Sequence, residues 1–231
     1  KKKYLKILAQ QLEKYESVRL SEVDGIVSIS DSDTNVFIDM GCNDSIKTIP
    51  FGINLRPLQK VNNKGLFFLG SLDWQPNIDG INWLSKMVSS ALVSKVIVAG
   101  RNPSKEIRLS DNLIMKGEVD DAEQFMKERG IMLVPLFSGS GIRIKILEAM
   151  AWGVPVIATR KAVEGLGVES GRHVLITDEP SQFADFANQL LKDKNRAEQL
   201  VQNAYEFVQE NYSNNRLTKN LIAFYNQLLN E

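Results

Sequence analysis

The 231-residue sequence has one cysteine, one histidine and no net charge. Cys42 has no second cysteine with which to form a disulfide, which is typical of a protein in a reducing compartment. The 28 basic residues balance 28 acidic residues, so the charge does not favour binding to nucleic acid. His173, in the stretch GRHVLIT, is more typical of a strand edge than of a general base. The composition therefore argues against a nucleic-acid-binding protein.

The sequence also lacks a long hydrophobic run and a leader. No apolar stretch approaches the roughly 20 residues that span a bilayer. The first residues, KKKYLKILAQQLEKYE, contain no initiator methionine and no signal-peptide pattern. We interpret the sequence as the middle of a longer protein that lies in the cytoplasm. Association of the full-length protein with the inner face of a membrane stays open.

What the sequence does contain is a regular alternation of strand-like and helix-like segments. Short β-rich runs alternate with longer amphipathic runs, which is typical of a parallel sheet covered by helices. We therefore predict an α/β protein with a Rossmann-like, doubly wound parallel sheet. Strands are expected at 65–72, 95–100, 112–119, 130–136, 154–159 and 173–177. Helices are expected at about 78–90, 120–129, 142–152 and 180–192.

The residues before this sheet form a separate part of the chain. Residues 1–22 have helical spacing of apolar side chains and lead to strands at 25–30 and 46–50. The run PFGINLRPLQKVNNK contains two prolines and no hydrophobic period, so we interpret 51–64 as a linker. The predicted division is therefore 1–50, 51–64, 65–212 and a last helix at 213–231.

The most informative stretch follows the strand expected at 130–136. Residues 138–141, SGSG, are small and lie where that strand should give way to a helix from about Ile142. Small residues let a ligand approach the backbone, and the first N–H groups and positive dipole end of a helix favour phosphate. A tight turn with a serine cap explains these residues about equally well.

Two charged residues on the following helix favour a binding site. Lys145 and Glu148 lie three residues apart and share one helical face, away from Arg143. Glu148 is roughly 10 Å along the axis from the helix start, so a diphosphate at the N-terminus would leave its ribose near the carboxylate. The other residues of this helix are nearly all apolar, and a buried charge needs a partner or a ligand. A surface ion pair is the alternative explanation.

Three motifs in register resemble a known family. SGSGIRIK followed by LEAMAWGVPVIAT and EGL is similar to the donor-site signature of GT-B glycosyltransferases, in particular family 4 (group 1). The segments FLGSLDWQPNIDGINWL and GEVDD are similar to the same family in order and spacing. The resemblance implies two Rossmann-like domains that face across a cleft. Residues 1–50 would be a remnant of the N-terminal acceptor domain, 65–212 the nucleotide-sugar domain, and 213–231 the helix that crosses back.

The resemblance also implies roles for individual residues. Glu148 matches the second glutamate of the family's E-x7-E motif, which holds the ribose of the donor. Residues 139–142 match the loop under the pyrophosphate and sugar, and residues 117–119 match the segment whose backbone meets the base. The donor-binding residues expected from this comparison and from the strand ends are Gly70, Ser71, Gly117, Glu118, Val119, Gly139, Ser140, Gly141, Ile142, Arg143, Lys145 and Glu148.

The sequence departs from the family pattern at two places. Ser140 stands where the first glutamate of the motif would contact the donor sugar. Gly70 is followed by SLDWQPN rather than by the family's usual arginine and lysine. We infer that Lys145, with Arg143 as a weaker candidate, supplies the positive charge at the phosphates. Because charge develops on the diphosphate in the transition state, we expect Lys145 and Glu148 to be the catalytic residues.

These features together predict a glycosyltransferase that uses a UDP-, GDP- or ADP-sugar. The resemblance implies a retaining, metal-independent reaction without a cofactor. The acceptor, a sugar, lipid or polysaccharide, would bind mostly to the missing part of the N-terminal domain, so this chain alone should be inactive. A non-catalytic nucleotide-sugar-binding module and a GT-B sugar-nucleotide epimerase remain alternatives, although the single histidine argues against the epimerase.

Several other polar features are given less weight. Asp31 and Asp33, in SDSD, resemble a metal-binding DxD motif, but they follow a strand and are more typical of a helix cap. Trp74 and Asn77 are candidates for the border of the donor site, with a packing role about equally favoured. Arg101 follows a strand and is more typical of a solvated loop.

Overall fold

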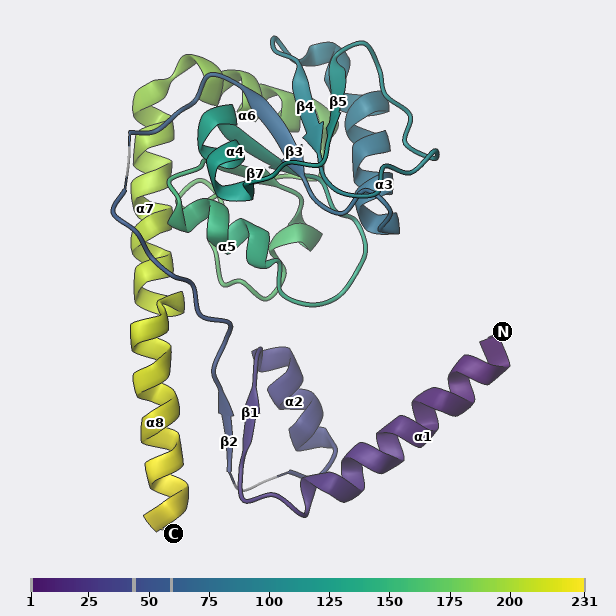
Figure 1. Cartoon of the computed structure of the whole chain (residues 1–231), viewed down its shortest axis with the longest axis vertical. Coiled ribbons are helices and arrows are strands. Elements are labelled where there is room, and N and C mark those ends of the chain that lie inside the picture. Colours follow the sequence, from purple (N-terminus) through teal and green to yellow (C-terminus); the bar gives the residue numbers. More distant parts are fainter. Residues whose placement is uncertain (1, 43–44, 59, 231) are drawn as a thin grey trace. The chain divides into compact units, whose positions relative to one another are not determined.

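The computed structural model describes residues 2–42, 45–58 and 60–230. The chain forms two compact units (Figure 1). The smaller unit contains the residues up to Gly52 together with those from Asn214 onward, and the larger unit runs from Ile53 to Ser213. The two units are described separately below.

The larger unit is built on a six-stranded parallel sheet. Its strands are β3 (Leu66–Leu69), β4 (Val96–Ala99), β5 (Leu113–Gly117), β6 (Ile131–Val134), β7 (Val156–Ala158) and β8 (Leu175–Ile176). They lie in the order β5-β4-β3-β6-β7-β8. The first three strands therefore extend the sheet in one direction and the last three extend it in the other, which is the doubly wound order of Rossmann folds. The predicted fold class is confirmed.

The strands are nearly continuous apolar runs because helices cover both faces of the sheet. Alternate side chains of one strand enter different cores, as period-two geometry requires. In β3, Phe67 belongs to one core, whereas Leu66 and Phe68 belong to the other. In β6, Met132 and Leu133 divide in the same way.

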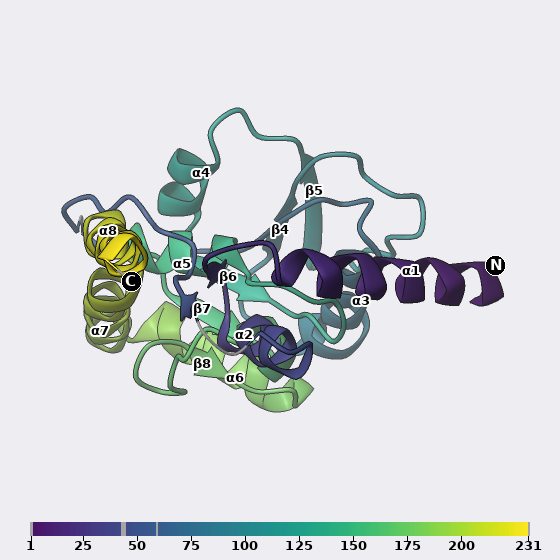
Figure 2. The same ribbon diagram turned by 90° about the horizontal axis from the view of Figure 1, so that it is seen from below.

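Five helices form the covering layers. They are α3 (Gln75–Trp83), α4 (Ala122–Arg129), α5 (Ile144–Ala151), α6 (Pro180–Lys192) and α7 (Lys194–Tyr212). Apolar side chains of α4 and α5 enter the core that contains Phe67, and those of α3 and α6 enter the opposite core. In Figure 2 the strands β6 and β7 lie between α4 and α6. Every helix of the larger unit thus buries one apolar face against the sheet or a neighbouring helix.

The smaller unit has two parallel strands and three helices. Its elements are α1 (Lys2–Leu20), β1 (Ile26–Ser28), α2 (Asp31–Asp39), β2 (Ile46–Thr48) and α8 (Asn214–Asn230). Ser30 caps α2 by accepting from the N–H of Asp33, so the SDSD stretch forms a helix start, as predicted. Asp31 and Asp33 lie in the first turn of that helix, where negative charge is favourable.

Element boundaries differ from the predicted ones in a consistent way. The predicted strands are longer than the observed ones, because the predictions include flanking residues such as 70–72, which lie outside the observed strands. The helix predicted at 142–152 begins at Ile144 instead, since residues 138–143 remain irregular. The helix predicted at 78–90 ends at Trp83 and continues as a π-helical turn and a short 3₁₀ turn to Ala91.

Two parts of the larger unit differ from the sequence-based description. The helix α7 was not predicted, although it has a clear apolar stripe at Ala197, Val201, Ala204 and Val208. Its N-terminus carries the usual signal, because Asp193 accepts from the N–H of Arg196. The segment predicted as a linker is also packed in part: the side chain of Asn63 is buried and donates to the carbonyl of Leu190 at 2.7 Å, and Ile53 enters the core.

Gly100, at the end of β4, is a position where a side chain should not be tolerated. A Cβ there would lie 1.7 Å from the carbonyl oxygen of Gly70, and the residue has φ +150°. We predict that Gly100→Ala lowers the free energy of unfolding by more than about 2 kcal/mol, measured by urea denaturation. Gly141→Ala is the control, because Gly141 also has a positive φ but open space around it, and should cost only about 1 kcal/mol. Equal losses of unfolding free energy in the two variants would show that the protein relieves the contact between the new methyl group and Gly70 without a cost in stability.

Candidate functional site

The sheet has one topological switch point, between β3 and β6. The chain leaves the carboxyl end of β3 toward β4 and the carboxyl end of β6 toward β7, so their loops diverge and leave a crevice. The loop after β3 begins at Gly70, and the loop after β6 contains the SGSG stretch at 138–141. Open parallel sheets bind ligands at such a crevice. The sequence-predicted residues therefore lie on the two sides of the expected ligand position.

Glycines end the three strands on one side of the switch point. Gly70, Gly100 and Gly117 follow or end β3, β4 and β5, which are neighbours in the sheet. A cavity of about 310 Å³ opens beside Gly70 and Gly100. It is lined by Leu69, Gly70, Ser71, Gly100, Arg101, Glu118, Val119, Asp120 and Ala122. The structure thus brings together four of the predicted residues, Gly70, Ser71, Glu118 and Val119, in one cavity.

Lys145 connects the two sides of the crevice. It lies in the first turn of α5, and its Nζ donates to the carbonyl oxygen of Leu69, at the end of β3, over 3.2 Å. The ammonium also lies 4.9 Å from the centroid of the Phe68 ring. Part of the residue stays exposed, but the surroundings of the ammonium are desolvated and contain no carboxylate partner in the described chain. Desolvation, together with the nearby charge of Arg143, lowers the pKa of Lys145 to about 7.

Arg143 has a different role from the one that helical spacing predicted. It is the N-cap residue of α5 rather than part of its surface, and its guanidinium is close enough to Lys145 to affect its pKa. The guanidinium donates to the carbonyl oxygens of Ser140 and Gly141, the latter at 2.7 Å, and stacks on Trp74. Desolvation lowers the pKa of Arg143 as well. Arg143 therefore shapes the SGSG loop from within.

The SGSG loop presents backbone rather than side chains. Gly139 and Gly141 have φ values of +97° and +85°, which only glycine adopts readily. A Cβ at Gly139 would lie 3.0 Å from both Arg143 and Trp74. Within the described residues, none accepts a hydrogen bond from the N–H groups of residues 139–141. The carbonyl groups of Ser140 and Gly141 accept from Arg143, and the N–H groups of residues 139–141 are free to donate to an acceptor such as a phosphate oxygen.

The serine cap considered from the sequence is absent, because no side chain caps the N-terminus of α5. Ile142 lies between the loop and the helix and packs against the core that contains Phe67. Ser140 is exposed, and its carbonyl is one of the two that Arg143 holds. A side chain at this position would therefore extend into solvent beside the loop.

Glu148 is the second charged residue of α5. It is half-buried, and within the described chain no side chain or backbone N–H donates a hydrogen bond to its carboxylate. Desolvation raises the pKa of Glu148, and the nearby carboxylate of Glu123 raises it further. Glu123 itself is paired with Arg56 and Lys127. Glu148 is thus a desolvated carboxylate that has acceptor capacity and no donor, which fits a pair of ligand hydroxyls.

One aromatic residue, Trp74, and one amide residue, Asn77, lie after β3 near the switch point. Trp74 is 39% exposed and lies over the guanidinium of Arg143. Asn77 is buried and donates from Nδ2 to the carbonyl oxygen of Ser71 at 2.8 Å. The contact with Arg143 supports the packing interpretation of Trp74, because the indole lies against the residue that shapes the loop. A place at the border of the donor site stays a prediction.

The remaining polar candidates lie elsewhere or are otherwise paired. His173 precedes β8 and so lies at the opposite edge of the sheet, where it stacks on Phe207 and its Nδ1 accepts from the N–H of Glu169. Burial lowers the pKa of His173. Arg101 forms an exposed ion pair of 2.7 Å with Glu118 at the rim of the cavity. In the described part of the chain, no group of three or more histidine, cysteine, aspartate or glutamate side chains is arranged to hold a metal ion.

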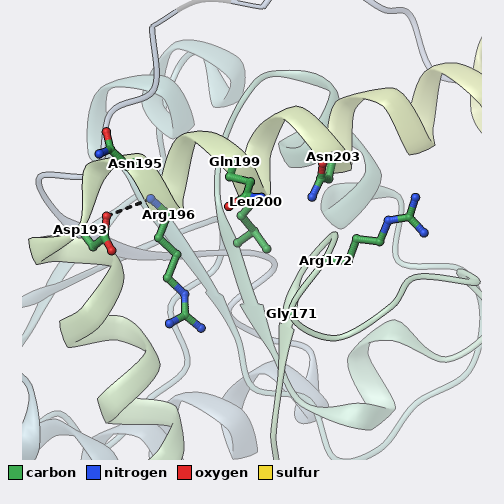
Figure 3. Close-up of a pocket in the computed structure, with 8 residues that line it drawn as sticks. All are labelled: Gly171, Arg172, Asp193, Asn195, Arg196, Gln199, Leu200 and Asn203. Carbon is green, nitrogen blue, oxygen red and sulfur yellow. Dashed lines mark hydrogen bonds between the residues drawn. The ribbon is translucent and has the colours of Figure 1, made fainter.

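A larger cavity than the one at the switch point lies elsewhere in the described part of the chain. A groove of about 640 Å³ runs between the start of α7 and the turn at Gly171 and Arg172 (Figure 3). Arg196 and Asn203 of α7 also line it. The groove lies where α6 ends and where the chain enters β8, an edge strand that is separated from the switch point by β6 and β7. Size alone therefore does not identify the functional site.

Among the residues that the structure describes, none of the helices combines the length and the apolarity needed to cross a membrane.

Comparisons with known proteins identify relatives of this chain. One relative, from Klebsiella pneumoniae, is an uncharacterized 44.6 kDa protein in the cps region, 24% identical over 173 residues, which are 68% of this chain and 45% of the relative. Another is the N-acetyl-α-D-glucosaminyl L-malate synthase of Bacillus anthracis, 24% identical over 163 residues, or 66% of this chain and 42% of the relative. The chain thus spans about half the length of these relatives.

A similar solved structure is that of a variant of TarM from S. aureus in complex with fondaparinux, α-GlcNAc-glycerol and UDP. It has a TM-score of 0.75 and 16% identity, and the similarity covers 93% of this chain and 46% of TarM. At that identity the likeness concerns the fold, which is that of the Rossmann-like domains of GT-B glycosyltransferases. The family model described as glycosyl transferases group 1 matches residues 63–193, more than half of the sequence, and the chain therefore belongs to that family.

Proposed function

We propose that this chain binds the nucleotide sugar of a glycosyltransferase and that the parent protein transfers the sugar to an acceptor. The observation that carries the proposal is the pair of desolvated charges on α5. Lys145 lies at the switch point with no carboxylate partner in the described chain, and Glu148 has no donor there. An isolated buried charge costs stability unless a ligand compensates it. A nucleoside diphosphate compensates both charges, because it offers an anion to Lys145 and ribose hydroxyls to Glu148.

The proposed pose follows the order of the groups along the crevice. The base lies in the cavity beside Gly117, Glu118 and Val119, with the ribose at Glu148 and the diphosphate between Lys145 and the SGSG loop. A cavity of about 310 Å³ is at the lower limit for small-ligand sites and suits one part of the ligand rather than the whole. The phosphates and the sugar would then lie toward the open side of the crevice.

The proposed reaction breaks the bond between the anomeric carbon and a diphosphate oxygen. The electron pair of that bond leaves with the nucleoside diphosphate, and an acceptor oxygen forms the new bond to the anomeric carbon while losing its proton. The negative charge that develops on the leaving oxygen is met by Lys145 and by the free N–H groups of the loop. We propose that the reaction retains the anomeric configuration and proceeds without a metal ion, in line with the resemblance to family 4.

The acceptor is proposed to bind outside this chain, in the half of the relatives' length that the chain does not span. We expect the 231-residue chain to bind nucleotide and to transfer no sugar. A radiolabelled UDP-, GDP- or ADP-sugar panel tests this with a mixture of saccharide acceptors. Robust transfer by this chain would contradict the proposal that the acceptor binds outside it.

We also propose a cytoplasmic location, with the parent protein at the inner face of a membrane.

Calorimetric titration with UDP-, GDP- and ADP-sugars is the direct test of nucleotide binding. Saturable binding of at least one of them is expected. Absence of binding to all three nucleotides, by a folded protein, would reject the proposal.

Glu148→Gln tests the ribose contact. The substitution keeps the size of the side chain but removes the charge, and a hydrogen bond to a charged group contributes about 1.5–3 kcal/mol. Nucleoside affinity should therefore fall by at least about tenfold, measured by calorimetry. Glu206→Gln, on the exposed surface of α7, is the matched control and should leave affinity unchanged. Unchanged affinity in Glu148→Gln would remove this residue from the site.

The same variant should not lose stability. Burial raises the pKa of Glu148 in the folded protein. The contribution of this residue to the free energy of unfolding is therefore fully favourable only below the ordinary pKa of a glutamate, and it is lost as the pH rises through the folded pKa. At neutral pH the charged carboxylate is therefore unfavourable, and glutamine relieves it. A melting temperature equal to or above that of the wild type is expected.

Lys145→Met tests the phosphate contact. Methionine keeps most of the aliphatic stem and removes the charge, so affinity for a nucleoside diphosphate should fall by at least about tenfold while affinity for the nucleoside changes little. Lys116→Met, exposed on β5, is the matched control. The measurement is the ratio of the two affinities at fixed ionic strength, because salt screens exposed charges. An unchanged ratio would show that Lys145 is not the phosphate charge.

Lys145 also predicts a pH dependence. In the free protein its pKa is about 7, and a bound anion should raise it, so binding takes up a proton. Affinity for a nucleotide sugar should decline as the pH rises above 7, by up to about tenfold per unit, and this decline should vanish in Lys145→Met.

The stability of the folded protein should depend on pH in the opposite direction. Because the pKa of Lys145 is lowered on folding, the free energy of unfolding should fall as the pH drops from the ordinary value of 10.5 toward 7. Lys145→Met should remove that fall as well.

A further inference from the structure

The backbone N–H group of Ser71 faces the crevice at the switch point. On one side of this residue in the chain, the N–H of Gly70 donates to the carbonyl oxygen of Ala99 at 3.1 Å. On the other side, the N–H of Leu72 donates to the carbonyl oxygen of Arg101 at 2.8 Å. Both neighbours thus point to the end of β4. Because alternate N–H groups of an extended chain point to opposite sides, the N–H of Ser71 points away from β4.

No strand fills the space on that side. β6 is the other neighbour of β3, but the pairing of the two strands ends at Phe67 and Met132. Ser71 is exposed, and no acceptor for its N–H is found in the described chain. The carbonyl of Leu69 faces the same side by the same alternation, and it accepts from Lys145 of α5, the helix that follows β6. An anion in the crevice would therefore meet the ammonium and this N–H together.

Asn77 holds the peptide chain at this point. Its Nδ2 donates to the carbonyl oxygen of Ser71 at 2.8 Å. The same amide packs closely on Gly70: a Cβ there would lie 2.8 Å from Nδ2 of Asn77 and 3.2 Å from Nζ of Lys145, so a side chain would have to displace one of them. The loop after β3 is thus held at two successive positions, by α5 at Leu69 and by α3 at Ser71.

Asn77 differs from a second asparagine of the same helix. Asn82 donates to the carbonyl oxygen of Glu106 and accepts from the N–H of Arg108, so both ends of its amide are paired. Asn77 is only 3% exposed, yet its Oδ1 is buried and has no donor among the described residues. A buried oxygen without a donor costs stability. The amide of Asn77 is therefore a poor choice for packing alone, whereas that of Asn82 is a sound structural one.

We propose that the N–H of Ser71 donates to a phosphate oxygen of the ligand, and that Asn77 is the positioning residue that fixes the direction of this N–H. The proposal rests on the proposed function for the identity of the ligand, a nucleoside diphosphate. Lys145 supplies the positive charge and the peptide supplies a directed donor, which is strengthened when its acceptor is an anion. The SGSG loop meets the diphosphate from the β6 side, and Ser71 meets it from the β3 side.

The first arm of the test is an NMR titration of the wild-type chain with inorganic pyrophosphate, which needs no nucleotide site. The amide proton of Ser71 should move downfield and reach saturation, because it gains an anionic acceptor. The amide proton of Leu72 is the internal control and should move less, since it already donates to Arg101. A Ser71 amide signal that stays in place would overturn the proposal.

Asn77→Leu is the second arm. Leucine has a similar size and removes both polar atoms of the amide, so the peptide of Ser71 loses its anchor. Pyrophosphate affinity should fall by at least about fivefold, because a hydrogen bond to a charged acceptor contributes more than tenfold when it is well directed. Nucleoside affinity should stay the same. The melting temperature should not fall, because the unpaired Oδ1 is removed as well.

Asn82→Leu is the matched control on the same helix. It breaks two hydrogen bonds that hold residues 106–108, so the melting temperature should fall while pyrophosphate affinity stays the same. If Asn77 served packing alone, Asn77→Leu would give this same pattern. A lower melting temperature with an unchanged ratio of pyrophosphate to nucleoside affinity in Asn77→Leu would therefore overturn the positioning role.

The two proposals fail in different ways. If pyrophosphate shifts the Ser71 amide but UDP, GDP and ADP all fail to bind, the proposed function is wrong and the anion position at Ser71 remains. If a nucleotide binds while the Ser71 amide stays in place and Asn77→Leu keeps wild-type affinity, the anion position at Ser71 is wrong and the proposed function remains.

Discussion

The hydrogen bond from the Lys145 ammonium to the carbonyl oxygen of Leu69 joins the two halves of the sheet at its switch point. The partners are separated by 76 residues in sequence and belong to elements that follow different strands. The bond is formed at the cost of removing the ammonium from water, which the lowered pKa of Lys145 reflects. A single carbonyl is a weak counterpart for a positive charge. The free protein therefore holds a cation that is incompletely satisfied at the point where the fold leaves room for an anion.

The surrounding residues preserve that space in two ways. Glycines at the strand ends keep side chains out, and at Gly100 the neighbouring carbonyl leaves no room for even a methyl group. On the other side, Arg143 turns the carbonyls of the SGSG loop inward, so that the loop presents its N–H groups. The guanidinium can do this because Trp74 stacks on it and the chain packs around it. One cation thus organises the loop, while the other is held by a single carbonyl at the switch point, a distinction that spacing along a helix does not reveal.

The fold and the site differed in how far they could be predicted from the sequence. The apolar strands and the covering helices follow from periodicity, because each element must bury a face whatever its neighbours are. The strand-end positions of Gly70 and Glu118 followed from the same rule together with the binding geometry of parallel sheets. The capping role of Arg143 could not be predicted, since it depends on the irregular path of residues 138–143. Asn77 was considered only as a border residue, because its relation to Lys145 arises from the pairing of β3 with β6, which is a property of strand order rather than of local sequence.

The departures from the family pattern also have a common physical reading. The family's usual basic residues after the first strand are missing here, and the first turn of α3, which follows that loop, carries the neutral amide of Asn77. A positive charge lies instead on α5, on the other side of the crevice, where the ammonium of Lys145 reaches the carbonyl oxygen of Leu69 at the end of β3. A phosphate oxygen needs donors of suitable direction and at least one positive charge, and neither requirement specifies which side of the crevice supplies the charge. Moving the cation to α5 couples it to Leu69 and Arg143, and therefore makes its protonation depend on the fold around it. A solvent-exposed lysine or arginine after β3 would instead stay charged near neutral pH, whatever its surroundings in the fold.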